Sequence, residues 1–423
     1  MVVSAIALAC QVLAYIALPL CLSLFSSSSI SAYSVIVSFS ATVSIALTFY
    51  CDNALLSKSS NLSLKKSLAF LTSNLFILSL VSSAILLSNA FEPSFVPVVS
   101  SSYFAATLLA LGYLQSVNKV LSAYLITISK YRLSRFLNCL SPLLALLAQF
   151  TLFRFTSLGH ISSLVAGLGI SLVIFPVYIL ASKPSLKLAC KLVLLRGTDI
   201  TSSINRGKKL ASTYRSLLLS NSIGTLGIFL SSLISAFLPV VIISLCGVAI
   251  NSEFYIASRL LSPVTVVCSL WIIPKILAHL STANQSRKAF YLVLFGSSFV
   301  FFVSFLIVCL VGLAPELAHK IAPFKTISFA YPQVLPAAGL LIASQQLCAI
   351  CTLHQITRGK TSLILFWQLT VFSSSIAVFL FLAFSNPSYT PAITLLFISA
   401  SFSVTYLIWA ATSARDLYVH SHA

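Results

Sequence analysis

Two basic residues inside long apolar stretches are the residues of this sequence best suited to chemistry. Lys119 follows Gln115 and Asn118, and the three fall within about one turn of a predicted helix. If that helix ends near Lys130, Lys119 lies about 16 Å from its cytoplasmic end. A lysine at such depth costs on the order of 2–3 kcal/mol unless water, an anion or a partner group meets it. Lys119 therefore either binds an anion or extends its side chain toward the interface.

Arg259 is the second such residue. It follows Glu253 by six residues, which places it about 9 Å inside the outer edge of its predicted span. A guanidinium can hold a phosphate group through two parallel hydrogen bonds. The alternative is a structural pairing with Glu253 or with carbonyl groups at a helix end. We predict that Lys119, Arg259, Gln115 and Asn118 bind an anionic or polar substrate.

Other polar residues extend this candidate set. Single amides inside membrane spans more often join helices than bind a ligand, so their role depends on whether they converge on one cavity. The amides in question are Gln149, Asn221, Gln345 and Gln346, and the basic residues at a predicted cytoplasmic entrance are Lys130 and Arg215.

The acidic residues are few and poorly placed for catalysis. General acid and base chemistry on a glycosidic bond usually needs two carboxyl groups at close range. Transporters coupled to protons or sodium usually carry an Asp or Glu inside the bundle. All six acids lie outside the predicted spans or at their ends, and no two are close in sequence: Asp52, Glu92, Asp199, Glu253, Glu316 and Asp416. We therefore predict a protein that is not an enzyme and has no catalytic residue.

Two short motifs resemble binding sites but are incomplete. Gly359-Lys360-Thr361 looks like the end of a phosphate-binding loop, but His354 stands where the first glycine is required. Cys348, Cys351 and His354 have the spacing of zinc ligands, yet they straddle the end of one apolar span and lack a fourth partner. Packing within a helix bundle accounts for these cysteines better. We predict no metal and no cofactor.

The composition places the candidate residues in membrane-spanning helices. Apolar residues make up 59% of the 423 residues and charged residues only 7%, whereas about a quarter of an ordinary soluble sequence is charged. Apolar runs long enough to cross a bilayer, at roughly 20 residues each, recur along the chain. The predicted class is an all-α, multi-pass membrane protein with about twelve spans, at residues 2–25, 33–49, 68–87, 96–125, 136–152, 161–180, 216–246, 254–273, 289–313, 334–352, 363–384 and 391–408.

The basic residues gather between the apolar runs. The net charge is +19, from 25 Lys and Arg against six acids. Nucleic-acid binding would require a folded basic face, which short clusters between spans do not form, so we predict no nucleic-acid partner. With both termini in the cytoplasm, the cytoplasmic loops and tail hold 20 basic residues and the outer loops only Arg154, Lys320 and Lys325. This asymmetry follows the positive-inside rule.

A polar stretch at residues 181–215 divides the spans into two sets of six. We predict an N-terminal six-helix lobe at residues 1–180 and a C-terminal six-helix lobe at residues 216–423. Lysines recur every four residues from Lys183 to Lys191, among leucines. That spacing is typical of a helix that lies in the cytoplasmic interface against anionic lipid.

Scattered residues in both halves follow an order found in a known family. The second half has Leu238-Pro239-Val240, Gly247, Ala257-Ser258-Arg259, Pro263 and Pro274-Lys275 in succession. This order resembles the Wzx-type flippases for lipid-linked oligosaccharides, in the MOP superfamily with multidrug and toxin extrusion proteins.

The first half carries two weaker parts of the same resemblance. Leu111-Gly112-Tyr113-Leu114-Gln115, followed by Asn118 and Lys130, is similar to the family's fourth span. Tyr50-Cys51-Asp52 stands where the family has Arg-Tyr-Glu, so the arginine of that segment is missing here.

The resemblance implies a two-lobed fold around a central cationic cavity. The implied substrate is a polyprenyl-diphosphate oligosaccharide, such as an O-antigen or another surface-polysaccharide repeat unit of the lipopolysaccharide type. It would move from the cytoplasmic to the outer leaflet of a bacterial inner membrane by alternating access. The implied partners are membrane lipids and polysaccharide polymerase or assembly proteins.

Two other classes of function stay open. A cation-coupled exporter of small molecules shares the fold, so the fold does not separate it from a flippase. A membrane-embedded glycosyltransferase or polymerase usually has a substantial outer loop with catalytic side chains, and the predicted outer segments here are short.

Overall fold

The computed structural model describes the chain in separate segments. Every regular element among the described residues is an α-helix, and they contain no strand. The all-helical class is confirmed for this part of the chain, and the total of twelve spans in two lobes stays a prediction. The described residues are 24–48, 101–127, 131–182, 232–267, 333–357, 361–384 and 391–422, with isolated positions between 13 and 79 and between 226 and 230.

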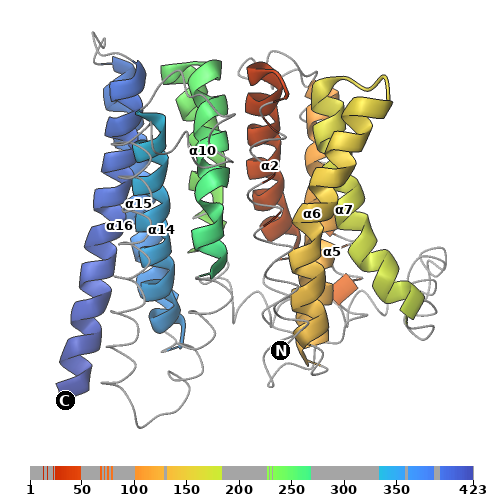
Figure 1. Ribbon diagram of the computed structural model, residues 1–423. Helices are drawn as coiled ribbons and strands as arrows, with labels where there is room; N and C mark the ends of the chain where they lie inside the picture. Colours follow the sequence, from red (N-terminus) through yellow and green to blue (C-terminus); the bar gives the residue numbers. More distant parts are fainter. Residues whose placement is uncertain are drawn as a thin grey trace. The chain divides into compact units, whose positions relative to one another are not determined.

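The described helices lie on the apolar runs of the sequence, and Figure 1 labels them. A shorter apolar helix, Ser232–Cys246, precedes α10. The labelled helices are α2 (Ser27–Thr48), α5 (Ser101–Thr127), α6 (Tyr131–Phe155), α7 (His160–Ser182), α10 (Val248–Val267), α14 (Val334–Thr357), α15 (Thr361–Phe384) and α16 (Pro391–His422).

Several helices are longer than the apolar runs that predicted them. α10 begins at Val248 rather than at residue 254, because Asn251 and Glu253 interrupt the apolar run without interrupting the helix. α16 continues to His422, beyond the predicted end at residue 408. Hydropathy marks where the chain becomes polar, whereas a helix ends where its backbone hydrogen bonding ends.

The chain divides into two compact units. Unit 1 contains residues 1–14 and 35–236, and unit 2 contains residues 15–34 and 237–423. The first eight residues of α2 therefore belong to unit 2 and the rest of α2 to unit 1. Nearly all of the polar stretch predicted to join the lobes lies outside the described residues, so its boundaries stay predictions.

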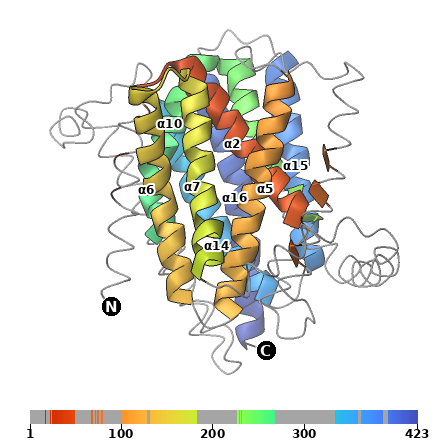
Figure 2. The same ribbon diagram turned by 90° about the vertical axis from the view of Figure 1, so that its right-hand side faces the viewer.

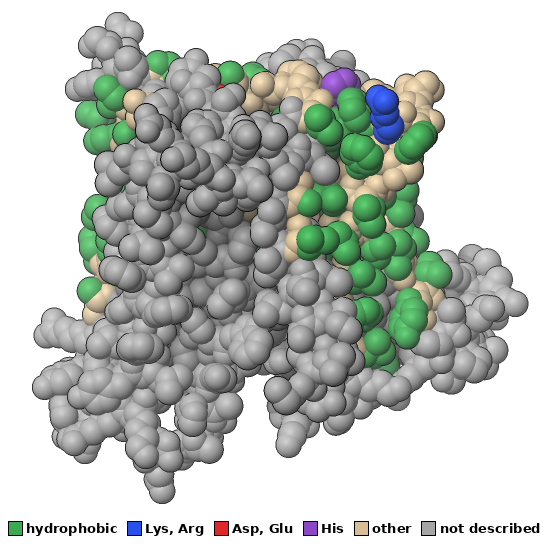
Figure 3. Space-filling view, in the orientation of Figure 1, with side chains coloured by type: hydrophobic (Ala, Val, Ile, Leu, Met, Phe, Trp, Pro, Cys, Tyr) green, Lys and Arg blue, Asp and Glu red, His purple; other side chains and the backbone are tan. Residues whose placement is uncertain are grey.

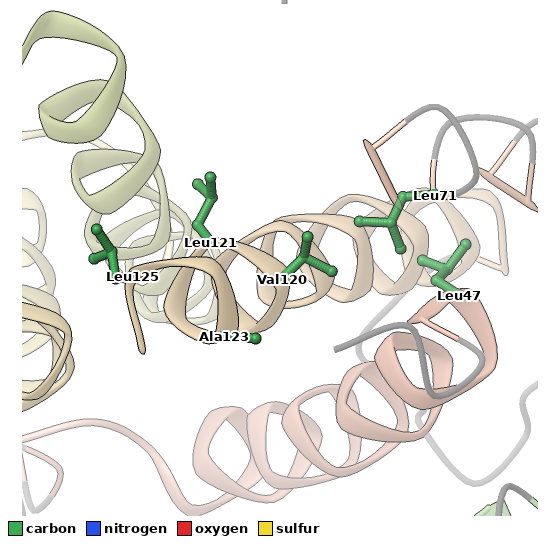
Figure 4. Close-up of a cluster of buried hydrophobic side chains, with 6 residues drawn as sticks. All are labelled: Leu47, Leu71, Val120, Leu121, Ala123 and Leu125. Atoms are coloured by element: carbon green, nitrogen blue, oxygen red, sulfur yellow. The ribbon is translucent and has the colours of Figure 1, made fainter. Parts of the chain in front are cut away.

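A cluster of buried aliphatic side chains forms a core in unit 1 (Figure 4). Most of them come from the C-terminal half of α5, directly after Lys119, and they are at most 4% exposed. The buried residues of α5 point to several sides of the helix, so neighbouring segments enclose this part of α5. The cluster consists of Leu47, Leu71, Val120, Leu121, Ala123 and Leu125.

Two glycines mark close helix crossings in unit 1, where α5, α6 and α7 lie side by side (Figures 1 and 2). A Cβ atom at Gly112 of α5 would lie 2.6 Å from Cγ1 of Val43 in α2. A Cβ atom at Gly167 of α7 would lie 2.6 Å from the backbone nitrogen of Gln149 in α6. Helices in membranes approach most closely where such small residues face a neighbour.

In unit 2, α14 packs against α16 and also contacts α10 and α15. Ala337 and Ala338 of α14 are fully buried, and small residues of this kind let helix backbones approach. Ser344 of α14 donates a hydrogen bond from Oγ to Oγ of Ser403 in α16, at 3.0 Å. Small side chains and a hydroxyl pair therefore hold these two helices together.

Gly247 separates the helix Ser232–Cys246 from α10. Its φ is +94°, in the region that favours glycine because a Cβ atom there meets the following carbonyl group. Its amide donates to the carbonyl oxygen of Ile243 at 3.0 Å, closing one helix. Its own carbonyl accepts from the amide of Asn251 at 3.2 Å, opening the next. The break thus leaves both backbone groups of Gly247 hydrogen-bonded.

Within the described part of the chain, three helices are long and apolar enough to cross a bilayer, judged by length and composition. They are Ser27–Thr48, His160–Tyr178 and Leu365–Leu382. The described surface over α6 and α7 is mostly hydrophobic, with charged and histidine side chains at one end (Figure 3). Exposed apolar side chains on these helices, such as Phe150 and Val177, suit contact with lipid chains. These helices indicate a multi-pass membrane protein.

Candidate functional site

The two basic candidates belong to different units, and each lies well inside a helix. Lys119 is the sole charged residue of α5 and is partly buried, eight residues before Thr127, or about 12 Å from the end of the helix. Arg259 is also partly buried, eleven residues after Val248, or about 16 Å from the start of α10. Arg259 therefore lies farther from the start of its helix than the sequence predicts, because α10 begins earlier.

The two amides near Lys119 bond to different neighbouring helices. Gln115 donates from Nε2 to Oγ of Ser40 in α2, at 3.2 Å. Asn118 donates from Nδ2 to the carbonyl oxygen of Leu172 in α7, at 3.1 Å. Side-chain hydrogen bonds of this kind join helices in membranes. The buried Oδ1 atom of Asn118 has no hydrogen-bond partner among the described residues.

Arg259 is held by an aromatic residue one turn earlier on α10. Its Nη2 atom donates to the hydroxyl oxygen of Tyr255 at 2.9 Å, and the guanidinium carbon lies 4.8 Å from the centre of the Tyr255 ring. Tyr33 in α2 packs edge-on against that ring, with the ring centres 6.0 Å apart. These contacts give the guanidinium a defined direction, which a flexible surface arginine lacks.

A buried amide, Asn251, lies one turn before Tyr255 on α10. Asn251, which is 1% exposed, donates from Nδ2 to Oγ of Ser31 at 2.6 Å and to Oγ of Ser34 at 3.0 Å. Asn251, Tyr255 and Arg259 are spaced by four residues and therefore share one side of the helix. Ser31 and Ser34 of α2 thus contact the same side of α10 that carries Tyr255 and Arg259.

Of the other predicted site residues, the structure describes the side chains of Gln149 and Gln345. Gln149 is 2% exposed and donates from Nε2 to the carbonyl oxygen of Leu164 at 2.9 Å, so it joins α6 to α7. Gln345 is partly buried in α14. Three predicted residues lie outside the described part of the chain, Asn221, Lys130 and Arg215, and the side chain of Gln346 is likewise not described.

A metal centre finds no support in the described residues, which contain no group of three or more His, Cys, Asp or Glu side chains close enough to hold an ion. Cys348, Cys351 and His354 all fall in the C-terminal part of α14, where the side chains lie outside the description. The prediction about these three residues therefore stays a prediction.

The residues that support Arg259 were not predicted from the sequence. The spacing of Asn251, Tyr255 and Arg259 was a usable signal, because polar residues four apart mark one face of a helix. No comparable indication in the sequence marked the α2 residues that contact this side of α10, because their segment is distant in the chain and rich in serine throughout. These residues are Ser31, Tyr33 and Ser34.

Solved structures of known transporters share this fold. The chain is similar to the inward-facing conformation of a multidrug resistance MATE family transporter of the MOP superfamily, at 11% identity and a TM-score of 0.57, over 98% of this chain and 96% of that one. It is similar to a MATE protein in complex with MaL6, at 13% identity and a TM-score of 0.54, over 100% and 96% of the two chains. The outward-facing conformation of a MATE family transporter gives a TM-score of 0.51 at 13% identity, over 98% and 94%.

The part of the chain that the structure describes is therefore all-helical, and the chain has the fold of the solved MATE family transporters. The sequence itself matches no protein family and no curated protein. At 11–13% identity the likeness shows the fold, and one fold serves different substrates.

Proposed function

We propose that the chain is a flippase that moves a polyprenyl-diphosphate-linked oligosaccharide from the cytoplasmic to the outer leaflet by alternating access. Lys119 of unit 1 and Arg259 of unit 2 would bind the diphosphate at successive stages, while the lipid tail stays in the bilayer. The membrane would be a bacterial inner membrane, with both termini cytoplasmic. Membrane lipids and polysaccharide polymerase or assembly proteins would be its partners.

The observation that carries this proposal is the placement of Arg259. A guanidinium about 16 Å from the start of α10, oriented by the Tyr255 hydroxyl and ring, suits a planar, doubly hydrogen-bonded partner such as a phosphate group. Lys119 adds a second positive charge inside a helix that carries no acid. A cationic side chain inside a membrane protein normally marks a path for a ligand or an ion.

An exporter of small molecules is the second candidate, because the similar solved structures include multidrug resistance transporters. The signs of the charges argue the other way. A cationic drug or a coupling cation is usually met by a carboxylate, whereas α5 has none and α10 has only Glu253. An exporter should confer drug resistance and show a proton or sodium flux.

The proposal is tested by the movement of a fluorescent polyprenyl-diphosphate oligosaccharide across proteoliposomes that contain the purified chain. We expect flipping above that of protein-free vesicles, measured by quenching of the label from outside, with and without imposed proton and sodium gradients. Vesicles with an established flippase serve as the positive control. If the substrate does not cross the membrane under any gradient, while the established flippase moves it, the flippase proposal is wrong. The exporter is then tested next.

Tyr255 gives a graded test of how Arg259 is held. Tyr255→Phe keeps the ring under the guanidinium and removes the hydroxyl acceptor, so we expect flipping at limiting substrate to fall about tenfold, the worth of one hydrogen bond to a charged group. Tyr255→Leu removes the ring as well and should fall further. Equal flipping by the wild type and both variants would show that these contacts do not position Arg259 for transport.

A further inference from the structure

A proline inside α7 leaves one backbone carbonyl group without its regular donor. Proline has no N–H group, so in a helix interior the carbonyl group four residues earlier loses its hydrogen bond. In α7 the proline is Pro176, and that carbonyl group belongs to Leu172. The helix nevertheless continues beyond the proline to Ser182. Leu172 is only 8% exposed, so the missing donor has to come from the protein.

The side chain of Asn118 supplies this donor from a neighbouring helix. Its Nδ2 atom donates to the carbonyl oxygen of Leu172 at 3.1 Å. α5 and α7 lie side by side (Figures 1 and 2), so α5 brings an amide to the point where α7 lacks one. Prolines are tolerated inside membrane helices where a neighbouring helix bonds to the freed carbonyl group in this way.

A second amide that donates to α7 makes a different kind of contact. Gln149 of α6 donates from Nε2 to the carbonyl oxygen of Leu164 at 2.9 Å. The residue four positions after Leu164 is Leu168, which has a backbone N–H group, so this carbonyl group keeps its regular helical donor. Gln149 therefore adds a hydrogen bond to an intact helix, whereas Asn118 replaces a missing one.

Proline is a common cause of a sharp bend in a helix, because the hydrogen bond that would resist bending is absent. Figure 1 shows the C-terminal turns of α7 leaning away from α6. These turns lead into the polar stretch predicted to join the two lobes. The bond from Asn118 is therefore placed to hold α7 at the point where it bends.

We propose that Pro176 is a hinge of α7 and that Asn118 is the positioning residue that holds it. Asn118 then acts through the carbonyl group of Leu172, which departs from its predicted role as a ligand of the substrate. The hinge sets the direction in which α7 reaches the polar stretch. It does not depend on the flippase proposal, because its evidence involves neither a substrate nor Arg259.

Thermal melting of the full-length protein in micelles tests whether one donor replaces the other. Asn118→Leu removes the amide at similar size and leaves the carbonyl group of Leu172 without it, so the melting temperature should fall by about 2 °C or more. Pro176→Ala returns a backbone N–H group to that carbonyl group. In the Pro176→Ala background, Asn118→Leu should therefore lower the melting temperature by roughly half as much or less.

Gln149→Met is the matched control. The carbonyl group of Leu164 has its backbone donor whether residue 176 is proline or alanine, so this substitution should shift the melting temperature equally in both backgrounds. If Asn118→Leu also shifts it equally in both, or leaves the wild-type value unchanged, Asn118 does not replace the missing amide and the proposal is wrong. A role of Asn118 in substrate binding alone would give that result, because no substrate is present.

The bend itself gives a readout that a purely stabilising contact would not move. Val177 follows the proline and Leu147 lies on α6, and their side chains are 55% and 52% exposed. Spin labels attached at these two positions through a ketone-bearing amino acid leave the native cysteines untouched. Double electron–electron resonance then measures the distribution of distances between the labels.

Asn118→Leu should broaden this distribution relative to the wild type, because α7 is no longer held at the hinge. With Pro176→Ala the distribution should stay narrow whether residue 118 is asparagine or leucine. An unchanged distribution in Asn118→Leu overturns the hinge, and this comparison stands even if Pro176→Ala does not fold. Both experiments are done without substrate, so their results are independent of whether the protein flips a lipid-linked oligosaccharide.

Discussion

Arg259→Ala should slow flipping of the polyprenyl-diphosphate substrate roughly 30-fold or more. Losing one partner of a desolvated, hydrogen-bonded charge pair costs about 2–5 kcal/mol, and each 1.4 kcal/mol is a factor of ten. Arg259→Lys keeps the charge but loses the planar fork, so its rate should fall between those of the wild type and the alanine variant. Initial rates in proteoliposomes at limiting substrate measure all three.

Lys119 supplies the second half of this test. Lys119→Ala should also slow flipping, and Lys119→Glu should be slower still, because an acid at that position repels the diphosphate. Arg154→Ala is the matched control: Arg154 is an exposed base near the end of α6, and its loss should leave the rate unchanged. If Lys119→Ala and Arg259→Ala both flip at the wild-type rate, the site assignment is wrong, whatever the substrate.

Gly167→Ala should destabilise the protein by about 2–3 kcal/mol, the usual cost of overpacking a tight contact. The added Cβ would lie 2.6 Å from the backbone nitrogen and 2.8 Å from Cα of Gln149. Because these are backbone atoms, rotation of a side chain cannot relieve the overlap and α6 and α7 must move apart. That movement also strains the hydrogen bond from Gln149 to the carbonyl of Leu164. A lowered melting temperature in micelles is the expected result.

Gly169 offers the control on the same helix, two residues away. A Cβ atom there would meet only Cδ2 of Leu111, at 3.9 Å, which is ordinary contact. Gly169→Ala should therefore keep or raise the melting temperature, since alanine favours a helix by about 1 kcal/mol over glycine. Equal melting temperatures for the two variants would contradict a close α6–α7 crossing at Gly167.

The sequence predicted the class of fold because membrane helices are encoded locally. An apolar run has to form a helix in lipid, where backbone groups find no water, so the described helices α2, α6, α7, α14 and α15 lie close to their predicted positions. Helix ends were predicted less well: the polar residues Asn251 and Glu253 ended the apolar run but not α10. The distance of Arg259 from the start of its helix was underestimated for that reason, whereas its depth in the membrane stays a prediction.

The candidate site was predictable only in part. A charge inside an apolar run is visible in the sequence, so Lys119 and Arg259 could be named. The partners of these residues depend on which helices are neighbours, and that is set by packing over long sequence separations. Thus only the structure shows the hydrogen bond from Gln115 to Ser40. It also shows the hydrogen bonds from Asn251 to Ser31 and Ser34.

Gly247, which ends the helix before α10, also makes the direction of Arg259 about the helix axis independent of the length of the preceding chain. In a continuous helix each inserted or deleted residue turns everything beyond it by about 100°. Gly247, with its φ of +94°, ends one helix and lets α10 start afresh, with Asn251 bonded to Gly247 in the first turn. Changes of length before Gly247 can be absorbed at this break. A single residue gained or lost between Gly247 and Arg259 would instead turn the guanidinium away from its side of the helix, so the number of residues in this short interval sets the direction of Arg259.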